Sequence, residues 1–363
     1  MERKENIMTK KEVLEIRKTM RPENCVITRI AGCYVDSDCN VISQFRKAFL
    51  SLDEEDAFKY FELFKKGLSG SIGKNLLNLR YKTKVHLQQQ EKLLALRDSK
   101  LSDDDILQEF YEQVIENYQN TGNYYIVIAH GIYDIPKKTS DEQTLEDASE
   151  EVYDFIYCTI CPVSLDKPGL SYNEKLNEMK NKTRDWMVET PANGFLFPAF
   201  SDRTSNIHEI LYYTKKTEDI QPDFITNVLG TEIPRTYEEE KNIISELTEK
   251  PMDFGQMMDI KHVFAELKEA YDTGNAEIGC TEIKGIYYGA GVIIDQDFDG
   301  TVNLSNLVEK KTKIKTGSCE IITESGESYD VVKKNGRKYL LIPIQDEISV
   351  DGIWTKAGTC DDK

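Results

Sequence analysis

The chain has 363 residues, which is more than a single hydrophobic core usually supports, so we expect more than one packing unit. Hydrophobic residues make up 39%, and 64 acidic side chains outnumber 46 basic ones to give a net charge of -18. This composition excludes a disordered chain and favours a well-solvated globular protein. An acidic surface repels phosphate backbones and anionic lipid, so neither nucleic acid nor a membrane is an expected partner.

The first residues, MERKENIMTKKEVLEIRK, are charged and lack the apolar core of a signal peptide. No run approaches the roughly 18 apolar residues of a membrane helix. We therefore expect a cytoplasmic protein whose eight cysteines are thiols rather than disulfides. Residues 1–7 are expected to form a flexible extension and residues 357–363 a tail.

The N-terminal part carries both helical and strand-like patterns. Apolar residues at helical spacing predict helices at Thr9–Met20, Asp53–Lys66 and Ser102–Tyr118. In the third, Ser102 and Asp105 resemble a capping box. The run CVITRIAGCYV, from Cys25 to Val35, is rich in β-branched and aromatic residues and predicts a strand, with a plausible bulge at Gly32.

The middle of the chain changes to the period of two that is typical of strands. We predict strands at Tyr124–Ile135, Val152–Leu165, Arg184–Pro191 and Gly194–Phe200. Short polar spacers after Val152 favour antiparallel pairing over helical crossovers. Residues 206–214 are ambiguous between strand and helix.

The C-terminal part begins with helices and then becomes rich in strands. A short helix is predicted at Pro222–Leu229, and a hairpin of helices at Tyr237–Thr248 and Gln256–Tyr271. After Gly274 we predict strands, including the run IKGIYYGAGVII. The fold class is therefore α+β with a mostly antiparallel sheet, divided into a main domain at 8–235, a helical segment at 236–275 and a small β-rich unit at 276–356.

Three motifs suggest chemistry but are incomplete. Cys158 and Cys161 form a lone CxxC in a strand, where residues three apart point to opposite sides and cannot chelate one metal. The run from Gly67 to Lys74 lacks the spacing of a phosphate-binding loop and is better explained as a helix end followed by a loop.

The third motif is acidic. Asp295, Asp297 and Asp299, followed by Gly300, match the first half of a calcium loop, with an apolar residue, Val302, at its eighth position. Asn306 stands where such a loop needs glutamate, and the preceding GVII predicts a strand rather than a flanking helix. A plain acidic turn is the competing interpretation, and we expect no cofactor.

The most site-like stretch is FPAFSDRTSNIH, from Phe197 to His208. Asp202 and His208 could form an acid–base pair and Arg203 could hold an anion, with His130 at a strand end as a further candidate. The competing interpretation is structural: Asp202 or Ser205 caps a short helix, Arg203 forms an internal salt bridge, and His130 is a satisfied core histidine.

Several long strings, among them YIVIAHGIYDIPKKTSD and RDWMVETPANGFLFPAFSDRTSNIHEILYYTK, resemble a family of Firmicutes proteins catalogued only as a domain of unknown function. The resemblance is strong from about Met8 to Gly230 and weaker beyond, as in NGRKYLLIPIQDEISVDG. It does not extend to the segment around Asp295. The resemblance implies a bacterial cytoplasmic protein and supplies no activity, cofactor or catalytic residue.

The leading functional hypothesis is a non-enzymatic binding or regulatory protein that acts through a protein partner. The absence of a complete catalytic motif and the 19 tyrosines, which suit an interface, favour it. One alternative is a hydrolase or transferase acting on a small polar or phosphorylated substrate through the 202–208 loop. Another is a nucleic-acid- or translation-associated protein, which would need a local basic face such as the lysines and arginines at 65–84 or the lysines at 310–315.

Overall fold

The computed structural model describes residues 8–81, 87–138, 144–145, 151–182, 184–233, 235, 237–248, 252–270, 277–298, 300–308, 311–315, 320–324, 329–342, 347–350 and 353–356. The expected extension at 1–7 and the expected tail at 357–363 lie outside these residues. The chain divides into two compact units, Met1–Thr236 and Tyr237–Lys363.

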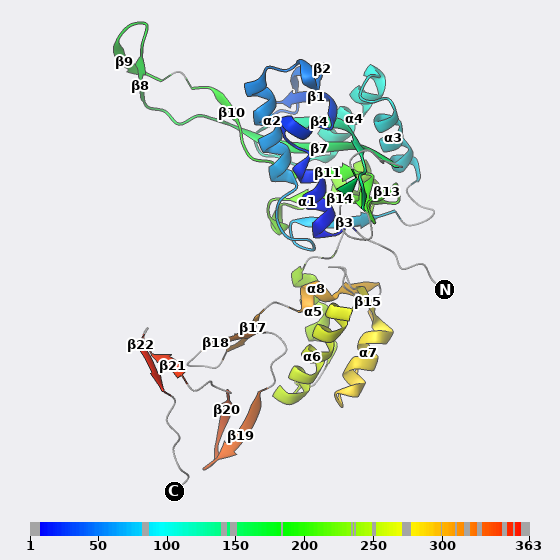
Figure 1. Cartoon of the computed structure of the whole chain (residues 1–363), viewed down its shortest axis with the longest axis vertical. Coiled ribbons are helices and arrows are strands. Elements are labelled where there is room, and N and C mark those ends of the chain that lie inside the picture. The colour runs from blue at the N-terminus through cyan, green and yellow to red at the C-terminus, as the bar shows by residue number, and fades with distance from the viewer. Residues whose placement is uncertain are drawn as a thin grey trace. The chain divides into compact units, whose positions relative to one another are not determined.

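The first unit is built on one antiparallel sheet of eight strands, in the order β2-β1-β4-β7-β11-β14-β3 with β10 also paired to β7 (Figure 1). These strands are β1 (Ile27–Val35), β2 (Val41–Ala48), β3 (Leu76–Arg80), β4 (Asn123–Asp134), β7 (Val152–Leu165), β10 (Trp186–Val188), β11 (Asn193–Phe197) and β14 (Glu209–Thr214). Three small hairpins accompany the sheet: β5 (Lys137–Lys138) with β6 (Thr144–Leu145), β8 (Leu170–Asn173) with β9 (Glu178–Asn181), and β12 (Ala199–Ser201) with β13 (Thr204–Asn206).

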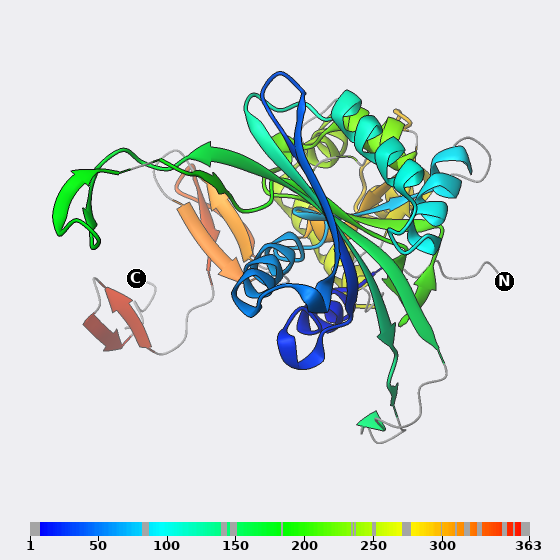
Figure 2. The same ribbon diagram turned by 90° about the horizontal axis from the view of Figure 1, so that it is seen from above.

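Helices cover both sides of this sheet, as Figure 2 shows. One side carries α1 (Lys10–Lys18) and α2 (Glu54–Gly67), and the other carries α3 (Leu87–Asp98), α4 (Asp104–Asn117) and the π-helix η4 (Phe224–Leu229). Short 3-10 helices lie at η1 (Pro22–Asn24), η2 (Phe49–Ser51) and η3 (Thr217–Asp219). We call the two sides the α1 side and the α4 side.

Alternation along the strands explains why both sides need a cover. In β4, Ile126 and Ile128 pack on the α4 side, while Val127 and Ala129 pack on the α1 side, and all four are fully buried. A strand buried on both faces reads as a continuous apolar run, as β4 and β7 do. Local signals then place the helices: Thr9 and Glu12 form a complete capping box at the start of α1.

The second unit has its own small core. Helices α5 (Tyr237–Glu246), α6 (Phe254–Ala270), α7 (Cys280–Gly289) and α8 (Leu304–Leu307) surround the pair β15 (Glu277–Gly279) and β16 (Thr301–Asn303), with Ile260, Phe264, Ile283 and Tyr287 buried among them. Three separate hairpins follow: β17 (Lys311–Lys315) with β18 (Glu320–Glu324), β19 (Asp330–Lys334) with β20 (Arg337–Leu341), and β21 (Glu347–Val350) with β22 (Ile353–Lys356).

The α+β class and the mostly antiparallel sheet are confirmed, and several local predictions need correction. The run at 283–294, predicted as strand, begins with helix α7, because Ile283 and Tyr287 are buried four residues apart, as a helix requires. The cap of α4 is Asp103, whose side chain accepts from the amides of Asp105 and Ile106, and not Ser102. The register of β1 shifts at Tyr34/Val35 and at Ile27/Arg29 rather than at Gly32.

No helix in the described part of the chain is long and apolar enough to cross a membrane.

Candidate functional sites

His130 lies fully buried in β4, between groups from the two neighbouring strands. Its Nδ1 is 2.5 Å from the Thr28 hydroxyl oxygen, and its Nε2 is 2.7 Å from Asp154 Oδ1, although the latter two atoms are not aligned as a hydrogen bond. Thr28 sits at the bulge of β1 and is exposed, whereas Asp154 is 34% exposed. The Thr28 hydroxyl, the His130 imidazole and the Asp154 carboxylate therefore lie in a row. In this arrangement the His130 ring could accept the proton of the Thr28 hydroxyl.

The 202–208 stretch forms a hairpin turn rather than the cap of a helix. Asp202 and Arg203 both have positive φ, at 52° and 55°, and connect β12 to β13. The Arg203 guanidinium binds Glu15 of α1, with Nη2 2.9 Å from Oε1, and donates to the Pro136 carbonyl at 2.9 Å. This is the internal salt bridge of the structural interpretation.

The contacts of Arg203 leave its charge compensated. Tyr133 donates a hydrogen bond of 2.9 Å to Glu15, and the Arg203 amide donates to Glu12 at 3.0 Å. The Glu15 carboxylate raises the pKa of Arg203 above its ordinary value. The Arg203–Glu15 salt bridge therefore links the β12–β13 turn to α1, and the guanidinium is not an open site for an anion.

The sequence candidates therefore separate into different networks. The partners of His130 are Thr28 and Asp154, and alternation in β4 places its ring on the α4 side, whereas Arg203 reaches α1 on the opposite side. His208 is exposed; its amide donates to Asn206 Oδ1 at 3.1 Å and its carbonyl accepts from Tyr81.

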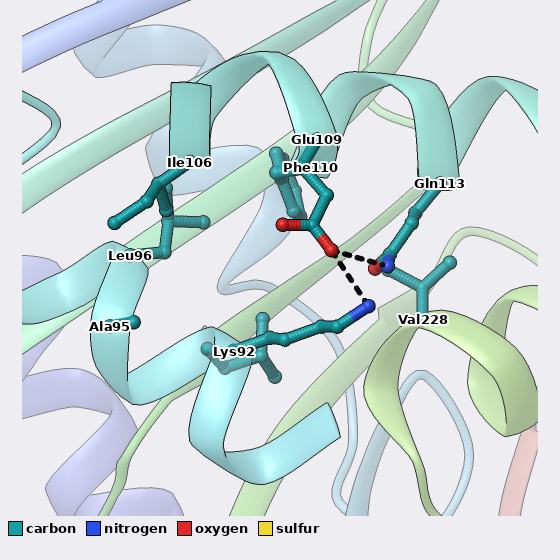
Figure 3. Close-up of a pocket in the computed structure, with 9 residues that line it drawn as sticks. Lys92, Ala95, Leu96, Ile106, Glu109, Phe110, Gln113 and Val228 are labelled. Carbon is teal, nitrogen blue, oxygen red and sulfur yellow. Dashed lines mark hydrogen bonds and ion pairs between the residues drawn. The ribbon is translucent and has the colours of Figure 1, made fainter. Parts of the chain in front are cut away.

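A small pocket opens between α3, α4 and η4 (Figure 3). Its volume is about 60 Å³, and its lining is Lys92, Leu93, Ala95, Leu96, Ile106, Glu109, Phe110, Gln113 and Val228. Two of the lining residues form an ion pair, with Lys92 Nζ 2.8 Å from Glu109 Oε1 (Figure 3). Ligand pockets typically span about 300–1,000 Å³, so this one has room for an apolar group of side-chain size and no more.

The two cysteines of the CxxC are both buried in β7. Cys158 packs into the core on the α4 side, and alternation directs Cys161, three residues on, to the other side. Burial raises the pKa of Cys158 well above its ordinary value and that of Cys161 to about 12. Both thiols are protonated at neutral pH, which does not suit a metal ligand or a redox thiolate.

The acidic loop lies in the second unit after α7. Asp297 Oδ1 is 2.6 Å from Lys284 Nζ and accepts from the Cys280 thiol at 3.5 Å. Lys284 lowers the pKa of Asp297. Asp295 is exposed, and Asp299 lies outside the described residues. Among the side chains that the structure describes, no group of three or more histidine, cysteine or acidic residues could hold a metal ion.

Sequence reasoning missed a projecting hairpin, which we call the β-arm and define as residues 166–188. The arm continues the β7–β10 ladder, where Leu165 pairs with Trp186, and ends in the β8–β9 hairpin beyond the sheet (Figures 1 and 2). Backbone hydrogen bonds tie its stem, from Asp166 to Asp185 and from Lys182 to Gly169. The signal that could have revealed it is the alternation of Leu170, Ser171, Tyr172 and Asn173.

Apolar side chains of the β-arm are exposed. Leu170 is 77% exposed, Met179 is 69% exposed and Tyr172 is 55% exposed. Trp186 and Met187, at the base, are each more than half exposed. Such a concentration of large exposed apolar groups on one projection is typical of a surface that binds a partner.

Comparisons with known proteins identify a family and nothing more specific. No curated protein and no solved structure matches the chain. A family model described as a domain of unknown function, DUF4317, matches residues 8–353. The match spans both units, so the chain belongs to the DUF4317 family.

Proposed function

We propose that this chain is a non-enzymatic cytoplasmic binding protein that recognises another protein through the β-arm. The observation that carries the proposal is the exposure of Leu170, Tyr172 and Met179 on a hairpin that projects from the sheet. A two-stranded hairpin is only marginally stable in water without a covered face. A partner that buries this face would therefore stabilise the arm and gain hydrophobic free energy at the same time.

Photo-crosslinking tests this proposal. We would place p-benzoylphenylalanine at Tyr172, and at Leu50 as a control, because Leu50 is 83% exposed and lies in η2, which is not part of the arm. In cells of the source organism we expect one defined protein adduct from position 172 and none from position 50. Adducts of the same kind and yield from both positions would contradict the proposal, because exposure alone would then explain them.

The structure gives less support to a hydrolase or transferase built on the 202–208 loop. Arg203 is engaged by Glu15 and is not available for a phosphorylated substrate. His130 keeps an acid–base arrangement with Thr28 and Asp154, and that arrangement is what an enzymatic function would have to use. Labelling of Thr28 by an acylating probe, lost in Thr28→Val, would favour the enzyme over the binding protein.

A second candidate function is calcium binding by the second unit. The specific observation is the β15–β16 register, which pairs Ile278 with Val302, the eighth residue of the motif that starts at Asp295. Glu282, four residues after Ile278, lies in the first turn of α7, where its carboxylate accepts from the Gly279 amide at 2.9 Å. A helix therefore precedes the acidic loop, where the sequence predicted a strand.

Calorimetric titration of the full chain with calcium chloride tests this candidate. We expect binding heat that disappears in Asp295→Ala and persists in Asp38→Ala, a change in an exposed acidic turn of the first unit. Lys284→Met should raise the affinity, because the lysine ammonium competes for Asp297. Absence of heat from both the wild-type chain and Lys284→Met would rule calcium out.

A further inference from the structure

We propose that the protein partner of the β-arm is a second copy of this chain, with the apolar face of one arm packed against the same face of the other. The inference rests on the proposed binding function and names its partner. It is carried by the register of the hairpin, by the apolar character of one of its exposed faces and by the charge of the arm relative to the rest of the chain.

The register gives the β8–β9 hairpin two unlike faces. Tyr172 pairs with Met179, and Leu170 lies two residues before Tyr172, so these three side chains share one face. Ser171 pairs with Lys180 on the opposite face. A hairpin with one apolar and one polar face is the pattern of a strand pair that covers something on one side only.

Three contacts outside the backbone ladder join the two halves of the arm. Lys182 forms an ion pair with Asp166 at the stem, and Arg184 Nε donates to the Asp166 carbonyl at 2.7 Å. At the tip, the Tyr172 hydroxyl donates to Asn177 Oδ1 at 2.7 Å. These contacts favour the hairpin conformation in the free chain and so reduce the entropy lost on binding.

The charge of the arm decides which partner fits. Residues 166–188 contain five basic side chains (Lys167, Lys175, Lys180, Lys182 and Arg184) and four acidic ones (Asp166, Glu174, Glu178 and Asp185), in a chain whose net charge is -18. A strongly basic partner would be drawn to the acidic remainder of the chain and not to this segment. A nearly neutral, apolar surface is the complement of the face, and the same face on a second copy supplies one.

Self-pairing brings together two segments that are each nearly neutral rather than two acidic surfaces. The two hairpins meet beyond the sheets of the first units, and charges separated by more than about 8–10 Å are largely screened at physiological salt. Lys180, on the polar face, points away from the contact. A two-fold axis through the paired faces closes the assembly at a dimer, because each copy uses the same patch once. Because each copy contributes only three apolar side chains to the contact, we expect a dissociation constant in the micromolar range.

Sedimentation equilibrium of the full chain tests the inference with a matched pair of variants. Met179→Glu places a charge on the apolar face, and Ser171→Glu places the same charge on the opposite face of the same hairpin. We expect a reversible dimer for the wild-type chain. Each copy contributes one residue 179 to the contact, so Met179→Glu places two charges there and should raise the dissociation constant at least a hundredfold. Ser171→Glu should change the dissociation constant by no more than about threefold.

The outcomes separate this inference from the proposed function. A wild-type chain that stays monomeric at high micromolar concentration overturns self-pairing, and so does a dimer that the two variants weaken equally or not at all. In the first case a crosslink from position 172 to a different protein would still support a binding function for the β-arm. If position 172 yields no adduct with any protein, the proposed function fails as well.

Discussion

Replacement of the Asn193 side chain should lower the stability of the first unit markedly. It lies at the start of β11 and is 1% exposed. Its Oδ1 accepts from the Tyr118 hydroxyl at 2.8 Å, and its Nδ2 donates to the Tyr212 hydroxyl at 2.8 Å and to the Asp219 carbonyl at 3.0 Å. One amide therefore joins the end of α4, strand β14 and the 3-10 helix η3.

Replacing Asn193 with leucine keeps the size of the side chain and removes all of its hydrogen-bonding groups. Each buried hydrogen bond lost costs about 1 kcal/mol, and each partner left unsatisfied in the core costs a further 1–3 kcal/mol. Tyr118, 6% exposed, has no other hydrogen-bond partner among the contacts described, whereas Tyr212 keeps one from the Gln221 amide. We therefore expect Asn193→Leu to lower the free energy of unfolding by about 3–5 kcal/mol.

Urea unfolding measures this loss of stability. Pulsed hydrogen exchange of peptides from β11 and β14 provides the readout, so that unfolding of the second unit does not contribute. A double-mutant cycle with Tyr118→Phe tests the cause. Removing both partners together should cost at least about 1 kcal/mol less than the sum of the two single changes, because neither polar group is then left alone. A loss below about 1 kcal/mol, or strict additivity, would refute the assignment of Asn193 as the hub.

Three further changes test the close packing at Gly32, the Arg203–Glu15 salt bridge and the dependence of stability on pH. A methyl group added in Gly32→Ala would clash with the Phe45 ring and the Tyr125 hydroxyl, so we expect the free energy of unfolding in urea to fall by about 1–3 kcal/mol, and an unchanged midpoint would contradict it. Arg203→Met leaves Glu15 without its cation and should cost about 1–3 kcal/mol, whereas exposed Lys59→Met should be neutral. Burial raises the pKa of Cys161 from 9.0 to about 12, so the unfolded chain ionises first, and stability should fall as the pH rises from about 9 towards 12. Urea midpoints should fall less steeply over this range in Cys161→Val, and parallel curves would contradict the reasoning.

Elements with local signals could be predicted from the sequence. The capping box at Thr9 and the glycine after η4 mark helix ends, and the apolar runs of β4 and β7 mark central strands. Strand β3 and helix α3 were not predicted, because β3 finds its partner far along the chain and α3 has little amphipathic pattern. Helix α7 was misassigned because its isoleucines and tyrosines have high strand propensity, while tertiary packing selects the helical period.

The candidate sites were harder to predict, for a related reason. His130 could be singled out by its place at the end of an apolar run, but Thr28 and Asp154 become its neighbours only through strand pairing across β1, β4 and β7. Arg203 and Glu15 are 188 positions apart. To predict the β-arm, one must know which of the alternating apolar residues stay exposed to solvent. A sequence pattern shows the alternation but does not show which face is exposed.

The place of β3 at the edge of the sheet has a consequence for synthesis of the protein on the ribosome. Arg80 and Glu209, which pair across β3 and β14, are 129 positions apart. At roughly 5–20 residues per second, β3 emerges on the order of ten seconds before its neighbour β14 is made. During that interval Leu76, Leu77 and Leu79, all buried in the finished sheet, lack strand β14, with which they pair. Until β14 has been translated, the nascent chain therefore carries an apolar segment that is prone to aggregation and is a suitable substrate for a chaperone.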